Sequence, residues 1–136
     1  MADRFNSEVR SRIMAAIRNR DTKPEVIVRR FLYANGLRYR LHSRHLPGRP
    51  DIVLRRYAAV VFVHGCFWHR HADCRYAVVP KSNRSFWLKK FRGNRRRDLR
   101  TAAALRSAGW KVHTIWECEI SPRRLDRLLR TIVRER

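Results

Sequence analysis

The apolar run Ala58–Val63 (AAVVFV) is the feature that most limits how this chain can fold. Tyr57 precedes the run, and His64 and Gly65 follow it. A short, uninterrupted apolar run of this kind is typical of a strand that is buried on both faces. We therefore expect other elements of the chain to cover this strand on both sides.

The remaining sequence patterns predict an α/β domain. Helical patterns cover residues 7–19, 22–35 and 85–108 and begin again at Pro122, while strand patterns cover 37–41, 51–54 and 111–116. This order predicts a sandwich in which helices flank a small mixed sheet. A chain of 136 residues fits one domain. We divide it into a basic N-terminal helical arm, residues 1–20, and a main domain, residues 21–136.

The helix at 22–35 has clear signals at both ends. The pattern T-x-x-E predicts that Thr22 caps the helix and that Glu25 reaches back to the first turn. Gly36 is a typical residue just beyond a helix end. Four apolar side chains are expected to face the core: Val26, Ile27, Phe31 and Leu32.

The charge of the chain indicates its kind of partner. There are 33 Lys and Arg residues against 11 Asp and Glu, a formal net charge of +22. Nucleic acid is the first candidate partner, because neutralising phosphates releases counterions, and an anionic membrane surface is the second. The sequence contains no apolar stretch of transmembrane length and no apolar signal core. We therefore expect a cytoplasmic protein that does not enter a membrane.

The segment at 64–74 (HGCFWHRHADC) carries candidate metal ligands. The candidates are Cys66, His71 and Cys74, spaced C-x4-H-x2-C, together with Cys118 from beyond the strand pattern at 111–116. Three thiolates and one imidazole form a tetrahedral set that Zn²⁺ prefers in closed structural sites. Spacing alone does not decide between His71 and His69 as the nitrogen ligand. The simpler alternative is a loop with incidental cysteines.

Two kinds of side chain near this segment are suited to hydrolysis. A histidine that no metal uses can act as a general base near neutral pH, and His64 and His69 both lie close to the end of a strand. Asp51 follows Pro50 at the start of another strand, where one carboxylate and a substrate phosphate could bind Mg²⁺. The alternatives are a hydrogen-bonded structural histidine and an ordinary turn aspartate.

Large aromatic rings lie among cationic residues at two places, Phe67–Trp68 and Phe86–Trp87. Two adjacent rings do not fit easily into one small core, so we expect these rings to be exposed, where they could wedge between stacked bases. The alternative, strongest for Trp87, is that they pack in the core. The long helix that follows has a weak point at Gly93. Its phosphate-facing residues are expected to be Arg92, Asn94, Arg95, Arg96, Arg97 and Arg100. Asp98 interrupts this basic run and needs an ion pair or a role in an active site.

Several sequence blocks, in this order, resemble the very-short-patch repair endonucleases, the DNA mismatch nickases of bacteria. The blocks are RDTKPE (20–25), LPGRPDIV (46–53), VFVHGCFWH (61–69), FW (86–87), NRRRDLR (94–100) and GWKVHTIWECE (109–119). The resemblance extends from about Arg10 to Glu119. It implies a fold like that of type II restriction endonucleases of the PD-(D/E)xK type, with Pro50-Asp51 as the Pro-Asp, and a nuclease domain at 21–136.

The resemblance also implies the reaction and the residues that perform it. It implies a nick 5′ of the mispaired T in a T·G mismatch, with Mg²⁺ bound by Asp51 and by a backbone carbonyl near Val63. The strand after Pro-Asp reads VVFVH, without the acid-x-Lys of the wider superfamily, so this carbonyl would replace a side chain. His69 would be the base for the attacking water. Glu25, His64 and Asp98 would complete the catalytic site.

Further implications concern zinc, DNA contacts and partners. The resemblance implies a structural zinc on Cys66, His71, Cys74 and Cys118. It implies that Phe67, Trp68 and Trp87 intercalate beside the mismatch, with Met14 approaching from the other groove. The expected substrate is double-stranded DNA with a T·G mismatch, acted on by a monomer at the bacterial nucleoid, with mismatch-repair proteins as further partners.

Two other function classes fit part of the sequence. A non-catalytic, zinc-stabilised module that binds distorted DNA would explain the charge, the cysteines and the rings, but it leaves Glu25, Asp51 and the histidines without a role. A hydrolase with a catalytic zinc would also use the cysteine segment. Removing a structural zinc should unfold the domain, whereas removing a catalytic zinc should leave the fold intact.

Overall fold

The computed structural model describes residues 22–66, 74 and 79–135, and the fold below concerns these residues. The helices are α2 (Lys23–Ala34), α3 (Arg84–Ser107) and α4 (Pro122–Arg134). The strands are β1 (Arg40–Leu41), β2 (Ile52–Leu54), β3 (Ala59–His64) and β4 (Lys111–Trp116), and two short 3-10 turns cover Arg55–Tyr57 and Glu117–Glu119. The expected α/β class is confirmed.

The four strands form one mixed sheet in the order β1-β2-β3-β4. β1 and β2 are antiparallel, as are β2 and β3, whereas β3 and β4 are parallel. The apolar run is therefore an inner strand between β2 and β4, as its composition predicts. The first strand is shorter than the pattern at 37–41 suggested, because only Arg40 and Leu41 pair with β2.

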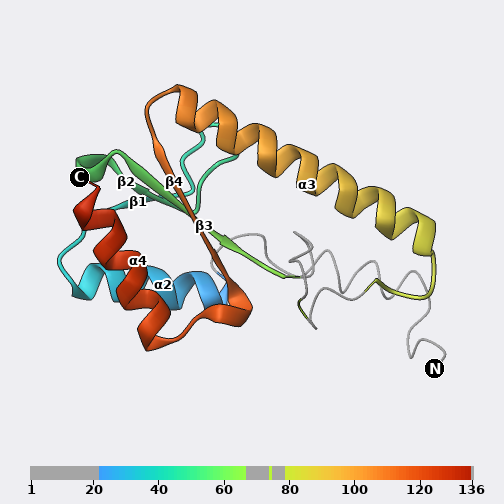
Figure 1. The fold of residues 1–136 in the computed structure, drawn as a ribbon, viewed down its shortest axis with the longest axis horizontal. Helices are drawn as coiled ribbons and strands as arrows, with labels where there is room; N and C mark the ends of the chain where they lie inside the picture. The colour runs from blue at the N-terminus through green and yellow to red at the C-terminus, as the bar shows by residue number, and fades with distance from the viewer. Residues whose placement is uncertain (1–21, 67–73, 75–78, 136) are drawn as a thin grey trace.

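Helices cover both faces of the sheet (Figure 1). Helices α2 and α4 lie together on one face, where their buried residues Val28, Leu32, Leu125, Leu128 and Ile132 pack with Ile52, Leu54, Ala59, Val61 and Ile115 of the strands. Helix α3 lies on the other face and packs through Leu105 against Val53 and Val60. Successive residues of β2 and β3 thus serve opposite layers, which explains why neither strand alternates between apolar and polar residues.

The ends of α2 are those expected, but its inner face is not. The side chain of Thr22 accepts a hydrogen bond from the Glu25 backbone N–H, which caps the first turn. Val28 and Leu32 are buried, whereas Ile27 is 40% exposed and was wrongly expected in the core. The buried face of this helix also includes the carboxylate of Glu25, which is 2% exposed.

Helix α3 is the long basic helix that the sequence predicts. It continues through Gly93 without interruption, so the expected weak point does not break it. It ends at Ser107, and Gly109 follows with a φ of +94°, a left-handed conformation that glycine adopts without strain. The N-terminal part of α3 extends well beyond the edge of the sheet (Figure 1). None of the helices described is both long and apolar enough to span a membrane.

Gly48 fixes the loop between β1 and β2 against α3, and we expect its replacement to be destabilising. Its φ is +73°, and a Cβ atom there would lie 2.2 Å from Cγ2 of Thr101. Gly48→Ala therefore combines a left-handed alanine with a steric clash, and should lower the free energy of unfolding by about 2–4 kcal/mol. Gly36→Ala is the matched control, because Gly36 has a φ of +88° but a Cβ atom there would meet no other atom within 4 Å. It should lose only about 1–2 kcal/mol. Urea unfolding of both variants measures the difference, and equal losses would contradict the clash.

Candidate functional site

Asp51 lies at the start of β2, immediately before Ile52, and its carboxylate reaches the neighbouring strand β3. Oδ2 accepts a hydrogen bond of 2.7 Å from the backbone N–H of Val63. The bond joins the beginning of β2 to the end of β3, which run antiparallel. The bond brings the Asp51 carboxylate to the backbone of Val63, the residue whose carbonyl group is the other expected Mg²⁺ ligand.

Glu25 provides a second carboxylate from the first turn of α2. Its side chain is almost fully buried, and a buried carboxylate requires cationic or hydrogen-bonding partners. Arg29, one turn later, places Nη1 3.8 Å from Oε1 of Glu25. The helix N-terminus adds its own positive partial charge. The carboxylate of Glu25 also has a partner outside α2, His42.

His42 is the main partner of Glu25 and was not predicted from the sequence. Its Nε2 atom contacts Oε1 of Glu25 directly, and its side chain is 19% exposed. The backbone N–H of His42 also donates to the carbonyl oxygen of Asp51 at 3.2 Å. One ligand-type atom from each of Glu25, His42 and Asp51 lies within 4.8 Å of the other two. We call these three residues the acid cluster.

The place of His42 follows from the register of the β1–β2 hairpin. Leu41 pairs with Ile52 in antiparallel strands, so the next residue on one strand faces the preceding residue on the other. His42 and Asp51 are these two residues. Sequence reasoning missed His42 because no local pattern shows which residues of two strands pair.

His64 directly follows Val63, whose backbone N–H donates to Asp51. Its ring is half-buried and contacts Trp116 of β4 edge to face, with ring centroids 5.0 Å apart. The ring of Phe62 also contacts it, with centroids 5.7 Å apart. His64 pairs with Trp116 as the last residue of the parallel β3–β4 ladder. Two elements therefore hold this imidazole near the Asp51 end of β3.

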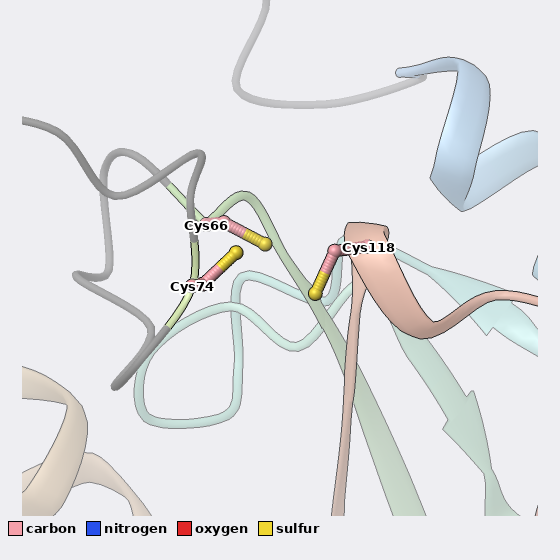
Figure 2. Close-up of side chains that lie close together, drawn as sticks. All are labelled: Cys66, Cys74 and Cys118. Carbon is pink, nitrogen blue, oxygen red and sulfur yellow. The ribbon is translucent and has the colours of Figure 1, made fainter.

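The three cysteines converge (Figure 2). The sulfur atoms of Cys66, Cys74 and Cys118 lie within 4.8 Å of one another, although Cys118 comes from the turn after β4. None of the three forms a disulfide. Burial raises the pKa of the Cys66 thiol to about 12. A soft cation that displaces this proton would stabilise the cluster, because thiolates are the ligands that Zn²⁺ favours.

Comparisons with known proteins agree with this geometry. Residues 2–76 match the family model described as DNA mismatch endonuclease Vsr. The chain belongs to the Vsr family. It is 45% identical over 137 residues to the type II nicking enzyme V.NmeAIP of Neisseria meningitidis, which covers 97% of each chain. It is 42% identical over 123 residues to the DNA mismatch endonuclease Vsr of Escherichia coli, covering 90% of this chain and 78% of the relative.

A third relative, the type II nicking enzyme V.XorIIP of Xanthomonas oryzae pv. oryzae, is 47% identical over 121 residues, 89% of this chain and 88% of the relative. The protein is therefore a DNA endonuclease, and its substrate is DNA. This identification argues against the non-catalytic DNA-binding module that the sequence left open. The acid cluster and the cysteine cluster are then the two candidate functional sites of a Vsr nuclease.

The aromatic pair at the start of α3 is divided between core and solvent. Phe86 is 58% exposed, whereas Trp87 is 6% exposed and stacks on Phe91 with centroids 5.8 Å apart. The expectation that both rings are exposed is wrong for Trp87, because it faces inward with Phe91, one helical turn later. Its intercalation in the Vsr reaction stays a prediction, and any insertion would require Trp87 to leave this packing.

The basic run of α3 also has two faces. Arg95, Arg96 and Arg97 are exposed, whereas Asn94 and Asp98, four residues apart, are half-buried on the face that carries Phe91. Asn94 is therefore less exposed than the arginines, and its contact with phosphate stays a prediction. Asn94 and Asp98 share the inner face of the helix because residues four apart lie above one another. The arginines remain the candidate phosphate contacts of this Vsr protein.

Some predicted site residues lie outside the described part of the chain. They are Met14, Phe67, Trp68, His69 and His71, and the basic arm at residues 1–20 is also outside it. Their roles in the Vsr reaction therefore stay predictions. The choice between His69 and His71 as the fourth zinc ligand stays open for the same reason.

We expect Trp87 to contribute to stability more than Phe86 does. Trp87→Ala should lower the free energy of unfolding by about 3–5 kcal/mol, since it removes a large buried ring. Phe86→Ala, the adjacent and exposed control, should change it by less than about 1 kcal/mol. Urea denaturation of the two variants measures both values. A small loss for Trp87→Ala would mean that the ring does not belong to the folded core.

Proposed function

We propose that this endonuclease nicks one strand of duplex DNA on the 5′ side of the mispaired T in a T·G mismatch, with Mg²⁺ as cofactor. The observation that carries the proposal is the meeting of Asp51 with Glu25 and with the Val63 backbone at one end of the sheet. The family model and the relative from Escherichia coli are both described as mismatch endonucleases, which supports the mismatch as substrate.

The donor atoms at this end of the sheet suit a hard cation. Asp51 and Glu25 offer carboxylate oxygens, and Mg²⁺ binds through one or two carboxylates together with substrate phosphate. Asp51 and the backbone carbonyl of Val63 are the proposed ligands. Bound there, Mg²⁺ would act as a Lewis acid for the charge that develops on the scissile phosphate. Glu25, held by His42 and Arg29, lies beside this position and can accept a hydrogen bond from water.

Histidines would move the protons of the hydrolysis. His69 is the proposed base, which takes a proton from the attacking water and is worth about 100- to 10,000-fold in rate. His64, whose ring contacts Phe62 and Trp116, is the second imidazole proposed to serve the hydrolysis. Asp98, half-buried on the inner face of α3, completes the proposed catalytic set.

Recognition of the mismatch would use rings and arginines. Phe67, Trp68 and Met14 are proposed to wedge beside the mispaired T, with Trp87 as a further candidate. Insertion favours a mismatch because a mispaired base unstacks more easily than a paired one. The exposed arginines Arg95, Arg96 and Arg97 would contact backbone phosphates, together with Asn94. We propose that the enzyme acts as a monomer, in the cytoplasm, alongside mismatch-repair proteins.

The cysteine cluster is proposed to hold a structural Zn²⁺ with His71 as fourth ligand. Three sulfur atoms already lie close enough to share one ion, and four ligands would leave no open position for substrate. Because Cys66 follows β3 by two residues, such an ion would stiffen the segment that carries His69 and the proposed wedge rings. Recognition and chemistry would then depend on the same segment.

Asp51→Asn should abolish nicking and preserve DNA binding. Asparagine keeps an oxygen that can accept the Val63 N–H, but it loses the negative charge that Mg²⁺ needs. We expect nicking of a T·G duplex to fall by about 1,000-fold or more, since metal assistance is worth several kcal/mol. Single-turnover cleavage with Mg²⁺ measures the rate, and fluorescence anisotropy in EDTA measures binding.

The controls for this experiment are a matched T·A duplex and the wild-type enzyme in EDTA. Neither should be nicked. Equal cleavage of both duplexes would support nuclease activity but contradict specificity for the mismatch. Loss of binding together with nicking in Asp51→Asn would mean that Asp51 is structural.

Purified protein should contain about one zinc ion per chain, and His71→Ala should lose it. His69→Ala is the matched control, which should keep the zinc and lose nicking. Chelation should lower the melting temperature and remove the cooperative transition, because binding of a structural zinc is coupled to folding. Elemental analysis and thermal unfolding test this. A chelated protein that stays folded but inactive would instead indicate a catalytic zinc. If zinc is lost in His69→Ala but not in His71→Ala, then His69 is the zinc ligand and His71 is not.

A further inference from the structure

The buried carboxylate of Glu25 depends on His42 more than on any residue of its own helix in the described structure. Arg29 approaches Oε1 to 3.8 Å, which is a distant ion pair, whereas Nε2 of His42 is in direct contact with the same oxygen. An imidazole N–H can donate to a carboxylate oxygen, and Nε2 is the nitrogen that faces Oε1 of Glu25. A hydrogen bond to a charged group in a buried place is among the stronger ones.

The backbone of His42 is tied to the other carboxylate of the acid cluster. Its N–H donates to the carbonyl oxygen of Asp51, directly across the β1–β2 hairpin. Its φ is +46°, a left-handed backbone conformation that residues other than glycine rarely adopt, and β1 ends there. One residue therefore contacts Glu25 through its ring and Asp51 through its main chain.

Two carboxylates held this close repel each other, so each needs a hydrogen-bonding partner to keep its place. The imidazole is that partner for Glu25, and its ligand atom lies within 4.8 Å of both carboxylates. Removing it would leave Glu25 with the distant Arg29 and would free its carboxylate to turn away from Asp51. The separation of the two carboxylates would then no longer be fixed.

We propose that His42 is a positioning residue of the nicking reaction: its imidazole holds the Glu25 carboxylate in place beside Asp51. This inference rests on the proposed function, in which Asp51 and Glu25 serve the hydrolysis. His42 acts through Glu25 and does not touch the scissile phosphate. The effect should therefore appear in the rate of the chemical step and not in the affinity for DNA.

The test compares His42→Ala with His42→Gln and with His45→Ala. His45 is exposed in the same loop, so it controls for loss of an imidazole near the site. In His42→Ala, kcat on a T·G duplex should fall by about 10- to 100-fold, the usual loss when a supporting partner of a metal-site carboxylate is removed. KM should stay within about threefold. His42→Gln, whose amide can donate to Glu25, should recover a large part of the rate, and His45→Ala should nick at the wild-type rate.

A double-mutant cycle shows whether His42 acts through Glu25. In a Glu25→Ala background, His42→Ala should cause no further loss beyond about twofold, because the partner is already absent. A full additional loss would overturn the proposal. So would wild-type nicking by His42→Ala, or equal loss in His42→Ala and His42→Gln when thermal unfolding and DNA binding show that both are folded.

The experiment separates this proposal from the proposed function. Asp51→Asn, assayed alongside, tests the metal-assisted nuclease itself. If Asp51→Asn is inactive and His42→Ala is fully active, only the role of His42 fails. If Asp51→Asn nicks like the wild type, the proposed function fails together with the role of His42 in it.

Discussion

The hydrogen bond between the Val63 N–H and the Asp51 carboxylate is the contact on which the arrangement of the site depends. It joins the first residue before β2 to the fifth residue of β3, and both strands belong to the inner part of the sheet. Because core side chains cover both faces of these strands, neither strand can shift without moving a packed layer. The bond therefore holds the Asp51 carboxylate in a fixed position relative to the packed core.

In a chain of net charge +22, the position of each acid carries information. Exposed acids next to arginines, such as Asp126 with Arg130, form surface ion pairs that contribute little to stability. Glu25 is different, because burial of a carboxylate is unfavourable and is accepted only with close partners. A buried acid beside a second acid is an arrangement that stability alone does not favour, which is why function is the better explanation for the acid cluster.

Local patterns predicted most of the fold, and tertiary contacts decided the rest. The strand 111–116, the helix cap at Thr22 and the end of the long helix before Gly109 follow from residue type and spacing within a few positions. The sequence also singled out Asp51 and Glu25, which the structure brings together. Their contact with His42 depends on the pairing of Leu41 with Ile52, which no local pattern contains. The burial of Trp87 was not predicted either, because Phe86 and Trp87 have similar polarity and only tertiary packing decides which ring is buried.

Strand β3 links the two clusters. The end of β3 and the two residues after it supply the Val63 backbone to Asp51, the His64 ring to Trp116, and Cys66 to the cysteine cluster. Cys66 is further tied to the end of β4, because its backbone N–H donates to Glu117 at 2.9 Å, one residue before Cys118. A cation on the sulfur atoms would thus join the ends of two parallel strands. Val63 lies only three residues before Cys66, so one short segment of backbone connects the acid cluster with the cysteine cluster.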